Sequence, residues 1–291
     1  MNCNLCPRKC NINRSEKIGF CGVTDKIKIA RAALHFWEEP CISGENGSGT
    51  VFFCGCNLKC VFCQNREISR GSSGKEITIF ELCDIFLRLE KEKANNINLV
   101  TPTHYIDSIA KAIDYAKDKG LNVPILYNSG GYDSVAALKM LDKKIDIYLP
   151  DFKYWDNSYA KKYSNCSDYS DIAIKAIDEM VKQVGKPEFN EKGIMTKGVI
   201  VRHLSLPYLE EDSKKIIEYL YKTYGDDIYI SIMNQYTPPA DIKPEEIKYP
   251  VSNQQYNEIV DFALDLGVTN AFIQEDGTVS ESFIPDFSSI E

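Results

Sequence analysis

The sequence lacks the features of membrane-spanning, exported and nucleic-acid-binding proteins. No apolar run in its 291 residues approaches the roughly 18 residues of a membrane span. The start, Met1 to Cys10, has no apolar core of the kind that signal peptides carry. The net charge is −8, and no run of basic residues could follow a phosphate backbone. We therefore expect a cytoplasmic globular protein that binds neither membrane nor nucleic acid.

Repeats and low-complexity tracts are also missing. The Gly-rich segment Ser43 to Gly49 is not followed by Gly-Lys-Ser or Gly-Lys-Thr, which excludes a P-loop there. The apolar fraction of 44% is ordinary for a chain with a substantial core.

Cysteine is abundant, with eleven residues. In a long chain without export signals, metal ligation explains such a number better than disulfide bonds do. The cysteines fall into an N-terminal group (Cys3, Cys6, Cys10 and Cys21), a second group (Cys54, Cys56, Cys60 and Cys63) and three scattered positions (Cys41, Cys83 and Cys166). Two separate metal sites are the natural interpretation.

From residue 50 onward, short apolar runs alternate with amphipathic stretches, as in parallel sheets built from strand-helix units. Predicted strands cover 50–53, 97–101, 124–128, 145–149, 198–203, 228–233 and 269–274. Predicted helices include one after the capping box of Thr78 and Glu81, and further ones at 106–116, 134–141, 172–181, 213–224 and 253–266. The pattern predicts an α/β protein with a partial or complete (β/α) TIM-like barrel at 50–291, preceded by a Cys-rich extension at 1–49.

Three cysteines follow directly on the first predicted strand of this barrel, as Cys56-Asn-Leu-Lys-Cys60-Val-Phe-Cys63. Such compact spacing can wrap a cuboidal iron-sulfur cluster, whose four irons each need a ligand. Three thiolates leave one iron open, and an open position is typical of catalytic metal sites. Cys54 is interpreted as a buried neighbour, and a zinc site or inert core thiols are the alternatives.

This C-x3-C-x2-C loop, with Phe62 before its last cysteine, resembles the cluster-binding loop of the radical S-adenosylmethionine (SAM) superfamily. The resemblance implies a [4Fe-4S] cluster on Cys56, Cys60 and Cys63 whose open iron binds SAM. It further implies reductive cleavage of SAM to methionine and a 5'-deoxyadenosyl radical, with the cofactors supplying the difficult chemistry.

Other segments resemble the glycyl-radical-enzyme activating branch, the relatives of pyruvate formate-lyase activating enzyme, and most closely its PflX-like group. They are Cys-Pro-Arg near the start, 55–65, 98–104, 127–132, 150–153 and 201–203. One departure stands out. Where activating enzymes carry a Gly-Gly-Glu motif that contacts the SAM amino group, this chain has Thr101-Pro102-Thr103-His104.

The same resemblance implies SAM-binding roles for residues at the ends of several predicted strands. Thr101 and Thr103 stand in for the motif that contacts the amino group, Asn128 is expected near the ribose or methionine part, and Arg202 suits a carboxylate. Lys153 is expected to pair with the SAM carboxylate and Asp151 with a cation. For His104 and His203, a functional role and a structural one both stay open.

The N-terminal cysteines follow the pattern Cys3-x2-Cys6-x3-Cys10-x10-Cys21. Four thiolates complete a tetrahedral zinc site or a fully ligated auxiliary [4Fe-4S] cluster, and the spacing does not decide between them. Free cysteines in a mobile tail are the alternative.

The leading functional hypothesis is SAM cleavage followed by hydrogen abstraction, with a glycine of a partner glycyl radical enzyme as the candidate target. An electron donor such as flavodoxin or ferredoxin is implied. One alternative is radical modification of another peptide or of a small molecule, because a shared fold does not fix the substrate. The other is a non-catalytic iron-sulfur or zinc protein that transfers electrons or serves as a scaffold.

Overall fold

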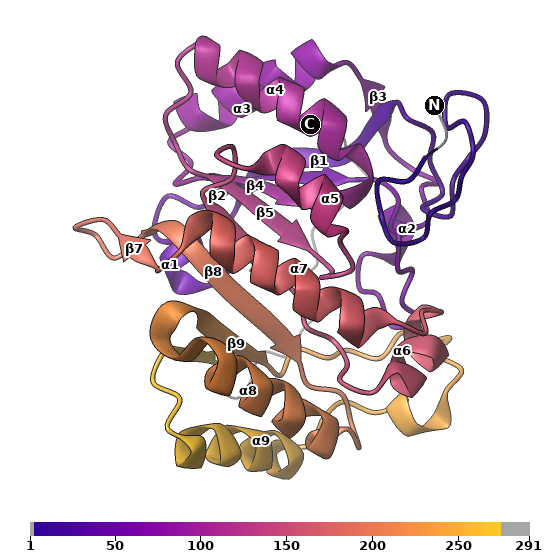
Figure 1. Ribbon diagram of the computed structural model, residues 1–291, viewed down its shortest axis with the longest axis vertical. Coiled ribbons are helices and arrows are strands. Elements are labelled where there is room, and N and C mark those ends of the chain that lie inside the picture. Colours follow the sequence, from indigo (N-terminus) through magenta and orange to yellow (C-terminus); the bar gives the residue numbers. More distant parts are fainter. Residues whose placement is uncertain (1–2, 275–291) are drawn as a thin grey trace.

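A curved, mostly parallel sheet forms the centre of the protein in a computed structural model that describes residues 3–274 (Figure 1). Its parallel part runs in the order β2, β4, β5, β6, β8, β9, β10. These strands are β2 (Ser48–Phe53), β4 (Ile97–Val100), β5 (Ile125–Ser129), β6 (Ile147–Pro150), β8 (Met195–Leu204), β9 (Tyr229–Met233) and β10 (Ala271–Ile273). All seven predicted strands are therefore present, and each lies within a few residues of its predicted range.

Antiparallel strands extend this sheet. β1 (Ile27–His35) pairs with β2, β3 (Lys75–Ile77) pairs with β1, and the short β7 (Glu188–Phe189) pairs with β8. Within residues 3–274 the order ends at β10 on one side and β3 on the other, so the barrel is partial. The sheet includes β1 from the predicted extension at 1–49, and the division of the chain at residue 49 stays a prediction.

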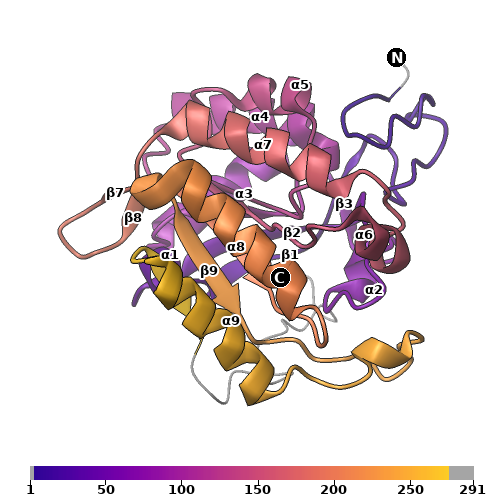
Figure 2. The same cartoon turned by 60° about the horizontal axis from the view of Figure 1, so that its bottom comes forward.

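Long helices cover the outer side of the sheet (Figures 1 and 2). They are α3 (Ile79–Lys91), α4 (Ile106–Asp118), α7 (Tyr169–Val184), α8 (Glu210–Tyr224) and α9 (Asn253–Leu266). The short helices are α1 (Pro40–Ser43), α2 (Arg66–Ser69), α5 (Val135–Leu138), α6 (Asn157–Ser164) and the 3-10 turns η1 (Thr103–Tyr105), η2 (Lys139–Leu141), η3 (Gly225–Asp227) and η4 (Glu245–Ile247). The predicted helices are present, although the one at 134–141 consists of α5 and the 3-10 turn η2, and the α-helices α1, α2 and α6 were not predicted.

Helix α3 begins as its sequence predicts. The Thr78 hydroxyl accepts a hydrogen bond from the Glu81 backbone N–H at 3.1 Å, and the Glu81 carboxylate accepts one from the Thr78 N–H at 2.7 Å. This reciprocal cap satisfies two backbone donors that the first helical turn leaves without partners.

The central strands are buried on both faces, which explains their continuous apolar sequences. Every residue of β2, β4, β5 and β6 is buried, as expected for parallel strands between helices and a filled interior. No helix among the described residues is long and apolar enough to span a bilayer.

One end of the sheet gathers chain segments from distant parts of the sequence. The N-terminal loop, α2 and α6 lie together at the carboxyl ends of the parallel strands, whereas β7 lies at the opposite end (Figures 1 and 2). In folds of this type, side chains on such strand ends and their loops form the reactive site.

Candidate active site

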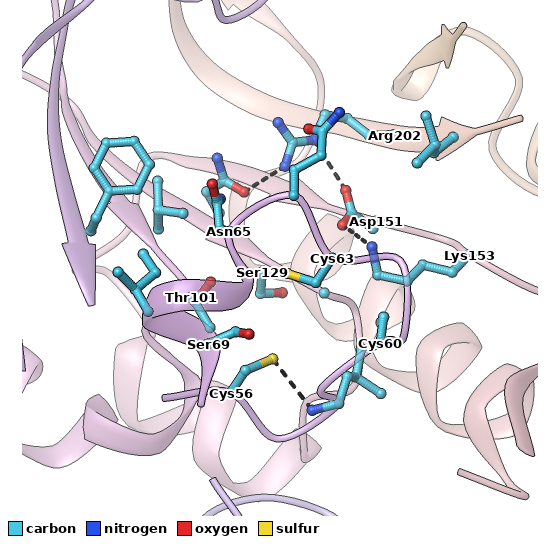
Figure 3. A pocket seen from close by; sticks show the side chains of 18 of the residues that line it. Cys56, Cys60, Cys63, Asn65, Ser69, Thr101, Ser129, Asp151, Lys153 and Arg202 are labelled. Carbon is cyan, nitrogen blue, oxygen red and sulfur yellow. Dashed lines mark hydrogen bonds and ion pairs between the residues drawn. The ribbon is translucent and has the colours of Figure 1, made fainter. Parts of the chain in front are cut away.

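The three cysteines of the loop after β2 lie around one cavity at this end of the sheet. Cys56, Cys60 and Cys63 line a cavity of about 230 Å³ together with residues from β1, β2, β4, β5, β8 and β9 and from the segment that follows β6 (Figure 3). The Leu58 N–H donates to Cys56 Sγ at 3.3 Å, and the Ser164 hydroxyl donates to Cys60 Sγ at 2.9 Å. The loop therefore presents three sulfur atoms to a single space.

The surroundings of Cys60 and Cys63 keep these two thiols protonated until a metal binds. Burial raises the pKa of Cys63 to about 12, and the neighbouring Cys60 and Cys56 contribute. Burial also raises the pKa of Cys60, against the opposing effect of Lys153. In residues 3–274 no three Cys, His, Asp or Glu side chains already lie at metal-ligand separations. Because thiolates are soft ligands suited to iron-sulfur clusters, the donor set fits such a cluster, whose binding would displace the thiol protons.

An ionic network forms another wall of the cavity. Lys153 Nζ donates to Asp151 Oδ2, and Arg202 Nε donates to Asp151 Oδ1 at 3.1 Å (Figure 3). Burial opposes the negative charge of Asp151, but the two cations outweigh burial and lower its pKa. Burial likewise opposes the Lys153 cation, yet Asp151 and Cys60 raise its pKa. Both side chains are therefore charged at neutral pH.

Two more groups complete the environment of Arg202. Its Nη2 donates to Asn128 Oδ1 at 2.6 Å, and its Nη1 donates to Glu38 Oε2 at 3.1 Å. The other oxygen of Glu38 accepts from Asn98 Nδ2 at 2.8 Å. The guanidinium is thus fixed on three sides, whereas Lys153 uses one of its three donors on Asp151.

Glu38 is a member of the site that the sequence analysis missed. It lies between β1 and α1, before the strand-helix units that begin at residue 50. The next residue, Glu39, is also buried, and its Oε2 has no hydrogen-bond partner. Burial raises the pKa of Glu39, with Arg202 opposing and Glu38 adding to the effect. The only sequence signal was two consecutive acidic residues next to an apolar strand.

Thr101 and Thr103, which lie in the segment at the position of the Gly-Gly-Glu motif, have different surroundings. Thr101 lines the cavity, and its φ of 59° is unusual for a residue other than glycine. Thr103 lies outside the lining, because its hydroxyl donates to the buried carboxylate of Asp133 at 2.7 Å. Asp133 also accepts from Tyr127 and Ser129. Thr103 therefore belongs to a buried network behind the cavity.

The two histidines at strand ends have structural surroundings. His104 Nε2 bonds the Cys54 carbonyl at 2.7 Å, and His203 bonds the Phe152 carbonyl and the Ser213 hydroxyl at 2.7 and 2.8 Å. Burial lowers the pKa of His104 to about 3 and that of His203 to about 4. Neither lines the cavity. Both are neutral at pH 7 and connect neighbouring segments.

The four N-terminal cysteines lie beside the loop that carries the triad. Cys6 and Cys21 are buried, and Cys3 and Cys10 are half-buried. The Cys56 N–H donates to the Cys21 carbonyl at 3.0 Å, so the two cysteine groups meet through the backbone. Cys54 is fully buried.

Comparisons with known proteins agree with this geometry. Residues 42–165 match a family described as a 4Fe-4S single cluster domain. The chain is 32% identical over 276 residues to the uncharacterized protein MJ0674 of Methanocaldococcus jannaschii, a match that covers 91% of this chain and 74% of that protein.

Solved structures share the fold at low sequence identity. The structure of HydG, a maturase of the [FeFe]-hydrogenase, has a TM-score of 0.54 at 18% identity, over 79% of this chain and 52% of that one. Streptococcus suis SuiB has a TM-score of 0.53 at 15% identity, over 79% of this chain and 48% of that one. The chain thus spans about half the length of these two proteins.

Proposed function

We propose that the chain is a member of the radical SAM superfamily, an enzyme that cleaves SAM reductively and uses the resulting radical to abstract a hydrogen atom. One observation supports this most strongly: three cysteines on one loop face a cavity with charged groups on another wall. A closed electron-transfer site would need a fourth protein ligand at this cluster. Structures of SuiB bound to SAM and to its precursor peptide SuiA carry the same fold.

Cys56, Cys60 and Cys63 would hold the [4Fe-4S] cluster. When bound, the cluster supplies the electron that cleaves SAM into methionine and a 5'-deoxyadenosyl radical. The protein contributes binding and orientation. The Leu58 N–H and the Ser164 hydroxyl donate hydrogen bonds to two of the sulfurs. Hydrogen bonds to ligand sulfurs tune the reduction potential of an iron-sulfur cluster.

Lys153 is the residue that we assign to the SAM carboxylate. It lines the cavity near Cys60 and retains two N–H donors beyond its bond to Asp151. Arg202 shares Asp151 but is fixed by Glu38 and Asn128 as well. We therefore assign Arg202 and Asp151 mainly to the orientation of Lys153 and to the charge of the cavity wall.

Thr101 and Asn128 complete the proposed SAM site, because both line the same cavity. Glu38 adds a carboxylate on the side of Arg202, in a chain whose Thr101–His104 segment lacks one. Thr103 acts through its bond to Asp133, as a positioning residue for the loop.

Membership of the PflX-like group and a glycine target remain proposals that rest on motifs such as residues 55–65 and 150–153. Flavodoxin or ferredoxin is the proposed electron donor. If the target is a glycine of a partner enzyme, a partner labelled with deuterium at glycine Cα will transfer deuterium into 5'-deoxyadenosine. Unlabelled product in the presence of a competent partner would favour another peptide or a small molecule.

The first experiment is anaerobic reconstitution with iron and sulfide, followed by reduction with dithionite in the presence of SAM. Wild type is expected to form 5'-deoxyadenosine, and Cys60→Ala is expected to form none. Cys83→Ala is the matched control, since Cys83 is fully buried in α3 and does not line the cavity. Absence of product from fully loaded, reduced wild type would favour the electron-transfer or scaffold alternative.

A further inference from the structure

The four N-terminal cysteines lie in a segment that has no part in the proposed SAM site. We propose that Cys3, Cys6, Cys10 and Cys21 form a second metal centre, closed by four thiolates, that holds the catalytic loop in place. This inference does not depend on the proposed function, because it concerns a different set of ligands.

Backbone hydrogen bonds fold the N-terminal segment into a compact loop around the cysteines. The Asn11 N–H donates to the Cys3 carbonyl at 3.0 Å, and the Lys9 N–H donates to the Cys6 carbonyl at 3.1 Å. Lys9 and Asn11 both have positive φ, at 43° and 52°. Residues with side chains rarely adopt this conformation without support from the surrounding structure. A mobile tail would not hold these contacts.

The sulfur atoms of Cys10 and Cys21 both lie beside Gly19. A Cβ atom at Gly19 would lie 3.3 Å from Cys21 Sγ and 3.9 Å from Cys10 Sγ, so the glycine leaves room between two of the thiols. The Cys10 and Cys21 thiols therefore lie next to the same small space. Cys6 is buried in the same segment.

Backbone N–H groups donate to the sulfurs of Cys6 and Cys10, as one does in the catalytic loop. There, Leu58 donates its N–H to Cys56 Sγ from two positions further along the chain. Cys6 receives the backbone N–H of Arg8, also two positions on, whereas the Cys21 thiol donates to the Val23 carbonyl at 3.8 Å. In addition, the Phe20 N–H lies 3.4 Å from Cys10 Sγ. Such contacts to sulfur typically support metal-bound thiolates.

Arg14 is a buried cation next to the same space. Its side chain is 5% exposed, and its Nε is a buried donor without a partner. Its Cδ would lie 3.8 Å from a Cβ at Gly19, the position between two of the sulfurs. An unpartnered buried N–H is costly unless an acceptor is present. Thiolates of a negatively charged metal centre supply that acceptor and a counter-charge.

The chemistry of this donor set is that of a closed site. Four thiolates fill the tetrahedron of a zinc ion, or provide one ligand to each iron of a [4Fe-4S] cluster. In either case no position is left for SAM. Metal binding would draw the sulfurs together and release their protons, as it does for other thiolate sites.

The N-terminal loop is hydrogen-bonded to the catalytic loop at Cys56 and at the next residue, Asn57. The Cys56 N–H donates to the Cys21 carbonyl at 3.0 Å, and Arg8 Nε donates to the Asn57 carbonyl at 2.7 Å. A Cβ at Gly55 would lie 2.8 Å from the Cys21 carbonyl oxygen, so glycine permits this approach. A metal centre that rigidifies Cys21 therefore also positions Cys56.

The N-terminal loop also contacts the segment next to Cys60. Arg8 Nη2 donates to the Ser164 carbonyl at 3.1 Å, and the Ser164 hydroxyl donates to Cys60 Sγ. The guanidinium of Arg8 also stacks 4.0 Å from the centre of the Phe20 ring. One arginine of the N-terminal loop thus connects the second centre with the surroundings of two catalytic cysteines.

The test uses the full chain with the catalytic cysteines removed, as C56A/C60A/C63A, purified anaerobically. We expect about one zinc per chain, or about four irons with matching sulfide, by elemental and sulfide analysis. X-ray absorption at the metal edge is expected to show four sulfur neighbours at ~2.3 Å around zinc or a cluster bound by four thiolates. Either metal supports the closed centre, and the analysis identifies which metal it holds. A metal-free protein, or nitrogen and oxygen ligands, would overturn the proposal.

Cysteine variants in the same background separate this site from adventitious binding. Cys6→Ser and Cys21→Ser are each expected to abolish stoichiometric metal, whereas Cys83→Ser retains it. If the first two variants fail to fold, the absorption spectrum of the folded parent still decides. Hydrogen exchange provides a readout of positioning: the peptide that spans residues 55–65 is expected to exchange faster in Cys21→Ser than in Cys83→Ser. Equal exchange in the two folded variants would refute the link to the catalytic loop.

Discussion

His203 provides a quantitative test of how the strand ends of the site are held. It lies on β8 beside Arg202, and bonds the Phe152 carbonyl after β6 and the Ser213 hydroxyl of α8. Burial lowers its pKa to about 4, compared with ~6.5 for an unfolded histidine. The folded state therefore binds fewer protons than the unfolded state between these two values.

The sign follows from proton linkage. A group that binds its proton mainly in the unfolded state stabilises the fold above its unfolded pKa, and that stability is lost as the pH falls. At pH 5 an unfolded histidine binds about one proton, and a group with a pKa near 4 binds about a tenth of one. From pH 7 to pH 5, His203 should thus cost the folded state about 2 kcal/mol of unfolding free energy.

The assay compares wild type with His203→Gln in urea denaturation at pH 7 and pH 5, followed by circular dichroism and by tryptophan fluorescence. Trp155 packs against Phe152, so it reports on this part of the structure. The variant changes stability at both pH values, but the difference between the two proteins should shrink by about 2 kcal/mol at pH 5. His104 titrates in both proteins, so its contribution cancels. A difference that stays the same at both pH values would refute the buried, neutral assignment.

Three further predictions concern the cavity wall and the loop beside it. Lys153→Met should weaken SAM binding by about tenfold, or ~1.4 kcal/mol, in calorimetry, whereas the exposed Lys162→Met should leave the affinity unchanged. Glu38→Gln removes the charge from a bond to a buried guanidinium, so it should lower the unfolding free energy by about 2 kcal/mol in urea titration; an unchanged midpoint would contradict the pairing. Gly131→Ala places a Cβ 2.1 Å from the Asp151 carbonyl and should lower both the thermal midpoint and 5'-deoxyadenosine formation. Gly185→Ala has a similar positive φ but open space, and equal effects of the two variants would exclude the contact as the cause.

Sequence patterns were sufficient for the strands and for most helices. Continuous apolar runs such as 97–101 and 145–149 predict strands because burial on both faces leaves no polar face, and the structure has strands at 97–100 and 147–150. Helix α6 was missed, since its eight residues NSYAKKYS are mostly polar and show no clear apolar stripe. The capping box at Thr78 was recognised because its two partners are only three residues apart.

Only part of the candidate site could be predicted from the sequence. The triad was visible because its three thiols are close together in the chain, and the N-terminal cysteines were visible as a spacing pattern. Glu38 was missed because its partners come from β4 and β8, far away in the sequence. The direction of the Thr103 side chain depends on the 3-10 turn η1, which no local signal predicted. Such placements follow from tertiary packing and need coordinates.

The central claim is that SAM binds at a cluster held by only three protein thiolates. The decisive measurement is the electron paramagnetic resonance spectrum of the reconstituted, dithionite-reduced protein with and without SAM. The signal that is missing from C56A/C60A/C63A is expected to change when SAM is added to wild type, because SAM enters the coordination of the open iron. A triad-dependent signal that SAM leaves unchanged, in protein with a full complement of iron, would contradict the proposed site.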